Sequence, residues 1–346
     1  GAMAEIDVRG VQARTRAVET RQLREVDLDA VRQLPQGTWT NRMTVDGYDE
    51  PIDLVASLTV SGDGIHVDYT GTSPMSSRGI NVPINYATAY SMFGLACAIA
   101  GDIPNNSGSL SVFSVSAPEG CVLNAPPPAP VSTRHVIGQM LPDVVFGCLR
   151  QFMPERVPAE GASCVWLLTL RGPTADAAQG RYGFTMGFTS NGGTGARETK
   201  DGLSATAFPT NLNGTPVEIA ETQTPLIFWR KELREGSGGE GEQRGGLGQV
   251  IEVESTCGKP FEILASFDRI FHPPRGRDGG GDGAAGFIGL ATGERLRGKG
   301  VQEIAPGQRL VIQTPGGGGS GDPRKRPPSQ IAADRADGLL TLEPAR

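Results

Sequence analysis

The sequence is poor in histidine and in paired cysteine, and each shortage argues against a class of site. The 346 residues contain 3 His, and no two of them lie within one helical turn, so no H-E-x-x-H or H-x-H metal pattern exists. The 5 Cys are odd in number, widely spaced and never in a C-x-x-C pair. This spacing argues against a disulfide framework and a zinc ribbon. We therefore expect no metal site in this chain.

Clustered positive charge and long apolar runs are also missing. The net charge is −6, and Lys and Arg are scattered among Asp and Glu, so no basic stripe could follow a phosphate backbone. No apolar run of about eighteen residues occurs, and the N-terminus lacks the pattern of a secretory signal. These absences predict a cytoplasmic protein that binds neither nucleic acid nor membrane.

Glycine and proline, in contrast, are abundant, with 49 Gly and 26 Pro. This content is typical of many turns and few long helices. Four glycine clusters lie at 191–202, 235–250, 275–286 and 314–323, with no fixed period and with strand-like segments on either side. We interpret them as loops of a folded sheet. The sequence thus predicts an α+β fold of strand-rich mixed sheets, a few packed helices and many glycine-rich loops.

Changes in hydrophobic pattern and glycine content along the chain predict three parts. Residues 1–35 comprise an expected tag remnant (Gly1, Ala2 and Met3) and a leading helix. Residues 36–175 form an expected α+β domain, and residues 176–346 a glycine-rich, β-dominated one. In the middle part, alternating residues predict strands at 37–47, 51–64, 65–72, 109–115 and 121–125. Apolar segments at 83–101 and 133–152 predict buried helices.

Two glycine-rich stretches resemble nucleotide-binding motifs, but neither matches its motif completely. In 235–250 the G-x-G-x-x-G pattern breaks at Arg244, two carboxylates stand where an anion would bind, and a strand follows instead of a helix. Residues 293–300 match G-x-x-x-x-G-K but carry Gly300 where a magnesium-binding Ser or Thr belongs. We therefore expect no nucleotide to bind this chain.

The stretch from Asn191 to Asp201 is the leading candidate site. Glycines such as Gly192 and Gly193 allow a close backbone approach, Arg197 is able to clamp an acidic group, and Asp201 is able to hold that arginine. An alternative interpretation of the same residues is a tight corner between strands with a buried ion pair. We assign Arg197 and Asp201 as expected catalytic residues, with Asn191, Gly192 and Gly193 as substrate contacts.

A second group of candidates lies near helix starts. Arg134 and His135 follow a proline-rich run at the start of a predicted helix, where imidazole pKa values are shifted and anions are favoured. We expect His135 to be catalytic and Arg134 to bind substrate. Glu218 and Glu221 lie three residues apart, so they face one way on a helical turn, and Glu218 is assigned to substrate binding.

Eight blocks in order resemble the hydantoinase B/oxoprolinase family, over almost the whole chain from Leu34 onward. These blocks are IHVDYTGTSPMSSRGIN, DIPNNSGSL, APEGCVLNAPPPAPV, PERVPAEG, NGGTGARETKDG, TNLNGTPVEIAE, EGSGGEGEQRGGLG and TPGGGGSGDP. The resemblance is to the C-terminal part of that family. It implies that an N-terminal half, with the acidic and histidine motifs of a divalent-metal site, normally precedes this region. The chain is then either a separate C-terminal polypeptide of a split B-type subunit or an isolated domain.

The resemblance also implies a function within a complex. An A-type ATPase subunit would bind ATP, and the B-type subunit would act on a small cyclic amide such as a hydantoin, a lactam or 5-oxoproline. Two alternatives remain: a subunit of an ATP-dependent ketone carboxylase of the acetone or acetophenone type, and a noncatalytic assembly subunit. We expect the isolated chain to be inactive and to bind no cofactor of its own.

Overall fold

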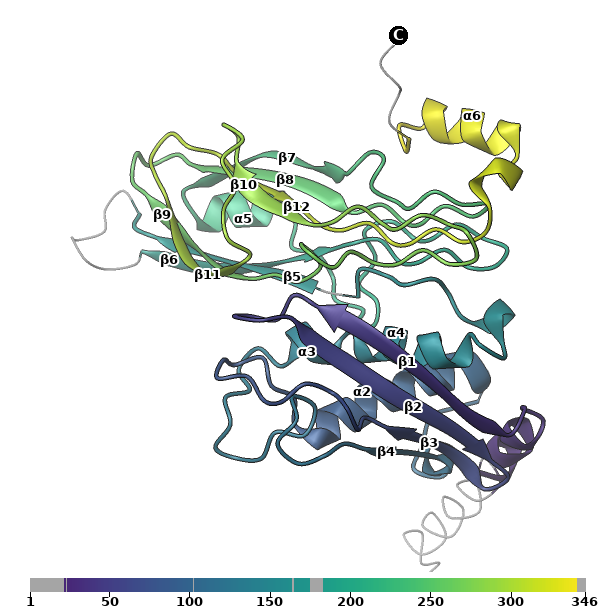
Figure 1. The fold of residues 1–346 in the computed structure, drawn as a ribbon. Helices are drawn as coiled ribbons and strands as arrows, with labels where there is room; N and C mark the ends of the chain where they lie inside the picture. Colours follow the sequence, from purple (N-terminus) through teal and green to yellow (C-terminus); the bar gives the residue numbers. More distant parts are fainter. Residues whose placement is uncertain (1–21, 23, 102, 164, 175–182, 341–346) are drawn as a thin grey trace, which may run out of the picture.

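Three four-stranded sheets form the framework of the protein in a computed structural model, which describes residues 22, 24–101, 103–163, 165–174 and 183–340. One sheet lies with its helices in the lower half of Figure 1, and the other two lie above it. Packed helices and long glycine-rich loops accompany the sheets, which confirms the predicted α+β class. Within the described ranges, no helix is long and apolar enough to cross a membrane.

The N-terminal sheet has the order β1-β2-β3-β4, with antiparallel neighbours except for the parallel pair β3 and β4. Side chains of β2 alternate strictly between buried and half-buried positions, as a strand with one covered face requires. The strands are β1 (Gly37–Val45), β2 (Ile52–Ser61), β3 (Gly64–Asp68) and β4 (Phe113–Ser116). Three of the strands predicted from alternation are therefore confirmed as β1, β2 and β3, and the fourth is confirmed in its second half.

Helices cover one face of this sheet. The predicted helix over 83–101 is confirmed as α2 (Ile84–Ile99), which packs against β4 and α4. Residues 24–32 are also helical, and the rest of the expected leading helix and the tag remnant lie outside the described residues. The 3-10 helices are η1 (Ser109–Val112), η2 (Pro154–Arg156) and η3 (Pro323–Lys325).

Two local predictions in this part are wrong. The helix expected over 133–152 is divided into α3 (His135–Gly138) and α4 (Leu141–Leu149). Pro142 lies in the first turn of α4, where its missing N–H is tolerated, whereas further inside a helix it would break a hydrogen bond. The strand expected at 121–125 is a turn with one bridge, between Pro74 and Cys121.

The other two sheets pack face to face as a sandwich. The side chains of Phe188 and Phe228, one from each sheet, meet edge to face with ring centroids 5.1 Å apart. One sheet has the order β10-β12-β8-β7 and the other β11-β9-β5-β6. Their strands are β5 (Val165–Gly172), β6 (Phe184–Asn191), β7 (Leu226–Leu233), β8 (Gln249–Ser255), β9 (Phe261–Ser266), β10 (Phe287–Leu290), β11 (Lys299–Ile304) and β12 (Leu310–Gln313). Helix α5 (Val217–Gln223) packs against β7.

Strand β5 belongs with the strands that follow it. It pairs with β6 over its full length and also with β9. The expected boundary between residues 175 and 176 separates β5 from these partners. The sandwich therefore begins no later than Val165. Hydrogen bonds between strands determine which sheet a strand joins, and the composition of the chain does not show them.

The four glycine clusters come together in one place, which we call the glycine bundle (residues 191–202, 235–250, 275–286 and 314–321). Its central segment is 314–321. Gly317 donates to Gly246 O over 2.9 Å, and Gly319 donates to Gly281 O over 2.9 Å. Ala196 donates to Gly318 O, also over 2.9 Å. One extended segment thus bonds to the other three, which confirms that the clusters are structured loops. In Figure 1 these loops extend to the right of the sandwich.

The C-terminal helix α6 (Pro328–Ala336) lies at the far end of these loops (Figure 1). The sandwich and the N-terminal sheet are joined elsewhere, at the end of β1. There the carboxylate of Asp46 accepts the backbone N–H of Ile270 (2.6 Å) and of His272 (2.9 Å). The ring Nδ1 of His272 also lies 2.9 Å from Asp46 Oδ1. His272 is thus part of the joint between the layers.

Candidate functional site

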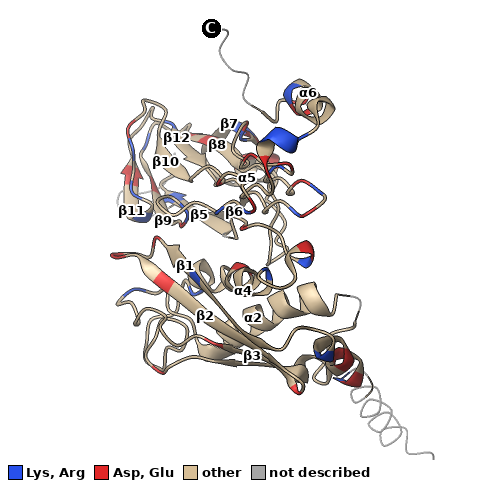
Figure 2. Ribbon diagram, turned by 45° about the vertical axis from the view of Figure 1, so that its right-hand side comes forward, with Lys and Arg blue, Asp and Glu red and all other residues tan. Residues whose placement is uncertain are grey.

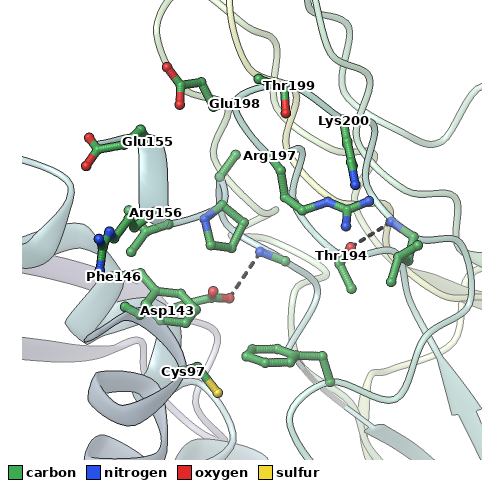
Figure 3. A pocket seen from close by; sticks show the side chains of 18 residues that line it. Cys97, Asp143, Phe146, Glu155, Arg156, Thr194, Arg197, Glu198, Thr199 and Lys200 are labelled. Carbon is green, nitrogen blue, oxygen red and sulfur yellow. Dashed lines mark hydrogen bonds between the residues drawn. The ribbon is translucent and has the colours of Figure 1, made fainter. Parts of the chain in front are cut away.

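A cavity of about 420 Å³ opens between the helices of the N-terminal sheet and the glycine bundle. One side of it is apolar, with side chains from α2, α4 and the loop 203–208. This side comprises Cys97, Ala98, Phe146, Leu203 and Phe208. The opposite edge is formed by 155–161 and 194–200, and in Figure 3 its charged side chains lie away from Cys97. They are Glu155, Arg156, Arg197, Glu198 and Lys200. A volume of this size suits a small organic ligand.

Asp143 is the buried polar group of the cavity wall. It lies in the first turn of α4 and is 2% exposed. Its Oδ2 accepts the backbone N–H of Gly161 over 3.1 Å and the hydroxyl of Ser163 (Figure 3 shows the cavity around it). Burial raises the pKa of Asp143 to about 6, against the opposing effect of the Ser163 hydrogen bond. A carboxyl group with such a pKa is suited to hold or release a proton near neutral pH.

Behind the cavity, the carboxylate of Glu160 lies close to the guanidinium groups of three arginines. It is 1% exposed, and its Oε1 accepts Arg275 Nε over 2.7 Å and Arg277 Nη2 over 3.3 Å. Arg269 Nη1 lies 3.5 Å from its Oε2. Burial alone would raise the pKa of Glu160, but the three guanidinium groups outweigh it and lower that pKa. Its carbonyl also accepts the N–H of Gly318 over 2.8 Å. Glu160 therefore fixes the wall segment 159–161 to the glycine bundle.

Arg197 lines the cavity, but the expected ion pair between Arg197 and Asp201 is not formed. The Arg197 guanidinium donates to the backbone carbonyl of Asp201 over 2.8 Å. The carboxylate of Asp201 instead accepts both Nη atoms of Arg326, each over 2.8 Å. It also accepts the backbone N–H of Arg244 over 2.7 Å. The residue that holds Asp201 lies 125 positions later in the chain, a distance that no local pattern reveals.

The residues Asn191, Gly192 and Gly193 lie inside the glycine bundle and do not line this cavity. A Cβ atom added at Gly193 would lie 1.8 Å from Gly246 O. The close approach that we predicted for these glycines is therefore made to another part of the same chain. Asn191 is buried, and its carbonyl accepts the hydroxyl of Thr314 over 3.0 Å.

Arg134 and His135 lie apart from Arg197. His135 borders a separate cavity of about 340 Å³, together with Tyr48, Arg78 and residues of β5 and β9. Burial lowers the pKa of His135, and the charge of Arg134 lowers it further. The guanidinium of Arg134 lies over the ring of Tyr86 at 5.7 Å. These two candidates thus do not form one site with Arg197.

Glu218 is exposed in the first turn of α5 and does not border the 420 Å³ cavity. Burial lowers the pKa of Lys231, and the charge of Glu218 opposes that effect. Glu218 is therefore part of the electrostatic surroundings of β7. Glu221, which we expected to face the same way, accepts the backbone N–H of Phe228 over 2.8 Å.

Sequence reasoning missed Asp143 and Glu160. The sequence around each residue nevertheless contains a feature that could have identified it. Asp143 is the one charged residue in the apolar stretch from Val136 to Leu149, and a buried carboxyl group in such a stretch is expected to have a shifted pKa. Glu160 lies directly before Gly161 and among small residues. The hydrogen-bonding and ionic partners of these two residues cannot be predicted from either position, because they lie on other segments of the chain.

The expectation that this chain holds neither a metal ion nor a nucleotide phosphate stays a prediction, and two observations bear on it. Among the described residues, no group of three or more His, Cys, Asp or Glu is arranged to hold a metal. In the central segment of the bundle, the amides of Gly317 and Gly319 are already donated to backbone carbonyls. A phosphate cradle needs such amides to point outward. The expectation that ATP and a divalent metal bind to other polypeptides stays a prediction.

Comparison with known proteins gives consistent matches. A family model described as Hydantoinase B/oxoprolinase matches residues 2–323. A protein of Pseudomonas sp. (strain NS671), assigned provisionally as the B-type subunit of a D-/L-hydantoinase, is 31% identical over 92% of this chain. 5-oxoprolinase 1 of Arabidopsis thaliana is 32% identical over 84% of this chain. The beta chain of the caprolactamase of Pseudomonas jessenii is 28% identical over 91%.

The chain spans only part of these relatives. It covers 56% of the Pseudomonas sp. protein, 57% of the caprolactamase beta chain and 22% of the Arabidopsis 5-oxoprolinase. The chain thus spans about half the length of the two Pseudomonas relatives.

Two solved structures share the fold. The ATP-dependent caprolactamase of Pseudomonas jessenii superimposes with a TM-score of 0.83, over 98% of this chain and 60% of that chain, at 23% identity. A nucleotide-free acetone carboxylase superimposes with a TM-score of 0.77, over 94% of this chain and 50% of that chain, at 18% identity. At these identities the superpositions establish a common fold.

Proposed function

The chain belongs to the hydantoinase B/oxoprolinase family, and we propose on that basis that it is the C-terminal portion of a B-type subunit in an ATP-dependent complex that hydrolyses cyclic amides. Its proposed partners are an A-type ATPase subunit and the N-terminal half of the B-type subunit. ATP and a divalent metal bind to those partners in this proposal.

The relatives support the reaction class. Hydantoinase, 5-oxoprolinase and caprolactamase are three names that denote action on a ring amide, and proteins with these names match more than four fifths of this chain. Their rings differ in size and substituents. We therefore leave the individual substrate open within the class of hydantoins, lactams and 5-oxoproline.

The observation that carries the proposal is the cavity with Asp143 in its wall. A cyclic amide has an apolar ring face and one polar N–C=O edge. Cys97, Phe146 and Phe208 offer an apolar surface to the methylene groups of the ring. Asp143, with its pKa of about 6, faces the same space and is suited to exchange a proton with the ring nitrogen.

Arg197 contributes positive charge at the edge of this cavity. Its described hydrogen bond uses one guanidinium N–H, to the carbonyl of Asp201, and a guanidinium has five. The remaining donors are able to contact negative charge that develops on the amide oxygen or on an activated form of it. Arg197 is the leading catalytic candidate in this proposal, and the cavity edge is open to polypeptides that complete the site.

Reconstitution tests the proposal. The chain is combined with the A-type subunit and the N-terminal half, and ATP consumption and ring opening are measured with hydantoin, 5-oxoproline and caprolactam. We expect ATP-dependent ring opening of at least one of them. Incorporation of bicarbonate into acetone or acetophenone in place of ring opening would support the carboxylase alternative, which the fold shared with acetone carboxylase favours. Absence of both activities would support a noncatalytic assembly subunit.

Replacement of Arg197 by Ala tests the site. We expect turnover by the complex to fall at least a hundredfold, because one preorganised donor to developing charge accounts for about that factor. The melting temperature should change by a few degrees at most, since Arg197 is exposed. The control is Arg309→Ala, which removes an arginine that stacks on Trp229 at 4.2 Å and does not line the cavity. Unchanged turnover in Arg197→Ala would refute the assignment.

A further inference from the structure

The charged turn at the edge of the cavity has no apolar anchor of its own. Its tip consists of Arg197, Glu198, Thr199 and Lys200, all four of which are exposed. The turn is closed by a hydrogen bond from Arg197 N to Lys200 O over 2.9 Å. Exposed polar side chains contribute little to fixing such a turn. Its position therefore depends on the residues on either side. Ala196 before it is buried and donates to Gly318 O, and Asp201 and Gly202 follow it.

Asp201 connects this turn to the C-terminal segment. Arg326 binds both oxygens of Asp201, in the bidentate geometry that gives a guanidinium and a carboxylate a fixed relative orientation. The same Arg326 donates through Nε to Asp334 of α6 over 3.1 Å and through Nη1 to Glu242 O over 3.0 Å. Arg244 lies 3.6 Å from Asp334. We call Asp201, Arg244, Arg326 and Asp334 the arginine–aspartate cluster.

This cluster is buried although it consists of charges. Arg244, Arg326 and Asp334 are each less than one tenth exposed, and Asp201 is half-buried. Burial would raise the pKa of Asp201, but Arg326 and Arg244 outweigh it and lower that pKa, so the carboxylate stays ionised. A buried charge network contributes less to overall stability than to a unique geometry.

Helix α6 depends on the same cluster. Asp334 is its buried residue, and eight of its nine positions are exposed or half-buried. With so little apolar surface covered, charge contacts hold the helix in place. Figure 2 shows basic and acidic residues together where α6 approaches the glycine-rich loops.

We propose that the C-terminal segment 322–340 positions the catalytic edge of the cavity: Arg326 orients Asp201, and Asp201 orients the turn that carries Arg197. Arg326 is thus a positioning residue. Its effect on activity rests on the proposed function, whereas its effect on the turn does not. Displacement of the C-terminal segment by a partner would release the cavity edge, which makes this contact a point of control.

Limited digestion of the full chain with trypsin tests the inference, because the turn itself contains two cleavage sites, Arg197 and Lys200. Cleavage rates at each site are followed by mass spectrometry. In Arg326→Ala we expect cleavage after Arg197 and Lys200 to accelerate about tenfold or more. Sites within strands, such as Lys231, should keep their rates. The matched control is Arg324→Ala, since Arg324 is 89% exposed and pairs with Asp322, two residues earlier.

A second variant covers the case in which Arg326→Ala does not fold, which would appear as acceleration at all sites together. Arg326→Lys keeps the charge and loses the bidentate geometry. It should accelerate cleavage at the turn severalfold, with the melting temperature near that of the wild type. Wild-type cleavage after Arg197 and Lys200 in a folded Arg326→Lys or Arg326→Ala variant would overturn the inference.

Kinetics of the reconstituted complex separate this inference from the proposed function. In Arg326→Lys we expect kcat/KM for the cyclic amide to fall at least fivefold, and Arg324→Ala to leave it unchanged. If no cyclic amide is turned over by the wild-type complex, the proposed function fails, and the trypsin result still decides the position of the turn. If turnover is normal in Arg326→Lys while cleavage accelerates, the segment orients the turn without serving catalysis, and the catalytic part of the inference is refuted.

Discussion

Leu58 in the N-terminal sheet and Gly317 in the glycine bundle are both buried, but they fill space in opposite ways. Leu58 of β2 packs its side chain into the apolar core beneath the helices. Gly317 brings its backbone against the backbone of Thr194, and a Cβ atom at Gly317 would lie 1.9 Å from Thr194 O. The N-terminal sheet is therefore filled by side chains and the glycine bundle by main-chain atoms.

This difference determines which substitutions the N-terminal sheet and the glycine bundle each tolerate. A side-chain core accepts other apolar residues of similar volume, because rotamers adjust. Main-chain atoms in contact have no rotamers, and their hydrogen bonds fix their spacing. The cavity takes its apolar side from the first kind of packing and its charged edge from the second. We expect changes of substrate size to be accommodated on the side of Cys97, Phe146 and Phe208.

Gly317→Ala should have the largest effect. The added methyl group meets backbone atoms that cannot move independently, so we expect a loss of roughly 3 kcal/mol or more, or failure to fold. The measurement is urea unfolding followed by circular dichroism. Gly62→Ala is the control, because no atom lies within 4 Å of a Cβ at that position. Equal unfolding midpoints for the two variants would refute the view that the bundle is packed by its main chain.

Leu58→Ala should have the next largest effect. Truncation of a fully buried leucine costs about 2–5 kcal/mol, whereas Leu58→Met should cost less than about 1.5 kcal/mol. The same unfolding experiment measures both. Leu167→Ala, at a leucine that is 39% exposed, is the matched control and should have a smaller effect. If Leu58→Met proves as damaging as Gly317→Ala, the contrast between the N-terminal sheet and the glycine bundle is lost.

Asp143→Asn should have the smallest effect, on the pH dependence of stability. The pKa of Asp143 is raised from 3.8 to about 6, so the folded protein binds this proton more tightly than the unfolded chain. The contribution of the carboxyl group to stability therefore falls as the pH rises from about 4 to about 6 and is constant above that. Asp143→Asn removes this pH-dependent contribution. The unfolding free energy of the variant should therefore decline less between pH 5 and pH 7 than that of the wild type.

The control for this titration is Asp53→Asn. Hydrogen bonds from Arg42 and Thr44 lower the pKa of Asp53, so its titration lies below pH 5 and the variant should keep the wild-type slope between pH 5 and pH 7. An unchanged slope in Asp143→Asn would show that this carboxyl group titrates normally. It would then be unsuited to the proton exchange that we propose for it.

Much of the fold was predictable because it depends on local patterns. Alternation located β1, β2 and β3, and a run of apolar residues located α2. Apolar content predicts one helix over 133–152 but does not locate the break before Pro142, where α4 begins. The assembly of four glycine clusters into one bundle was not predictable, because a glycine-rich loop does not indicate which carbonyl will lie against it.

The candidate site was less predictable than the fold. Arg197 was recognised from its glycine-rich surroundings and does line a cavity. Its expected partner Asp201 is instead held by Arg326, and the acidic group of the cavity wall, Asp143, lies in a stretch that was interpreted as an apolar helix. Contacts between segments far apart in the sequence determine both the partner of Asp201 and the place of Asp143 in the cavity wall. Such contacts cannot be inferred from a single sequence without its fold.

The central position of residues 314–321 has a consequence for how the protein is made. The ribosome releases a chain from its N-terminus, so all strands of the N-terminal sheet emerge well before residues 314–321. The other three glycine clusters cannot complete their hydrogen bonding until this shared partner emerges, because it follows all three in the sequence. Until then the groups that bond to this segment, such as Gly246 O and Gly281 O, have only water to bind. We expect chaperones to engage nascent chains that end before residue 314 and to release them once that segment has appeared.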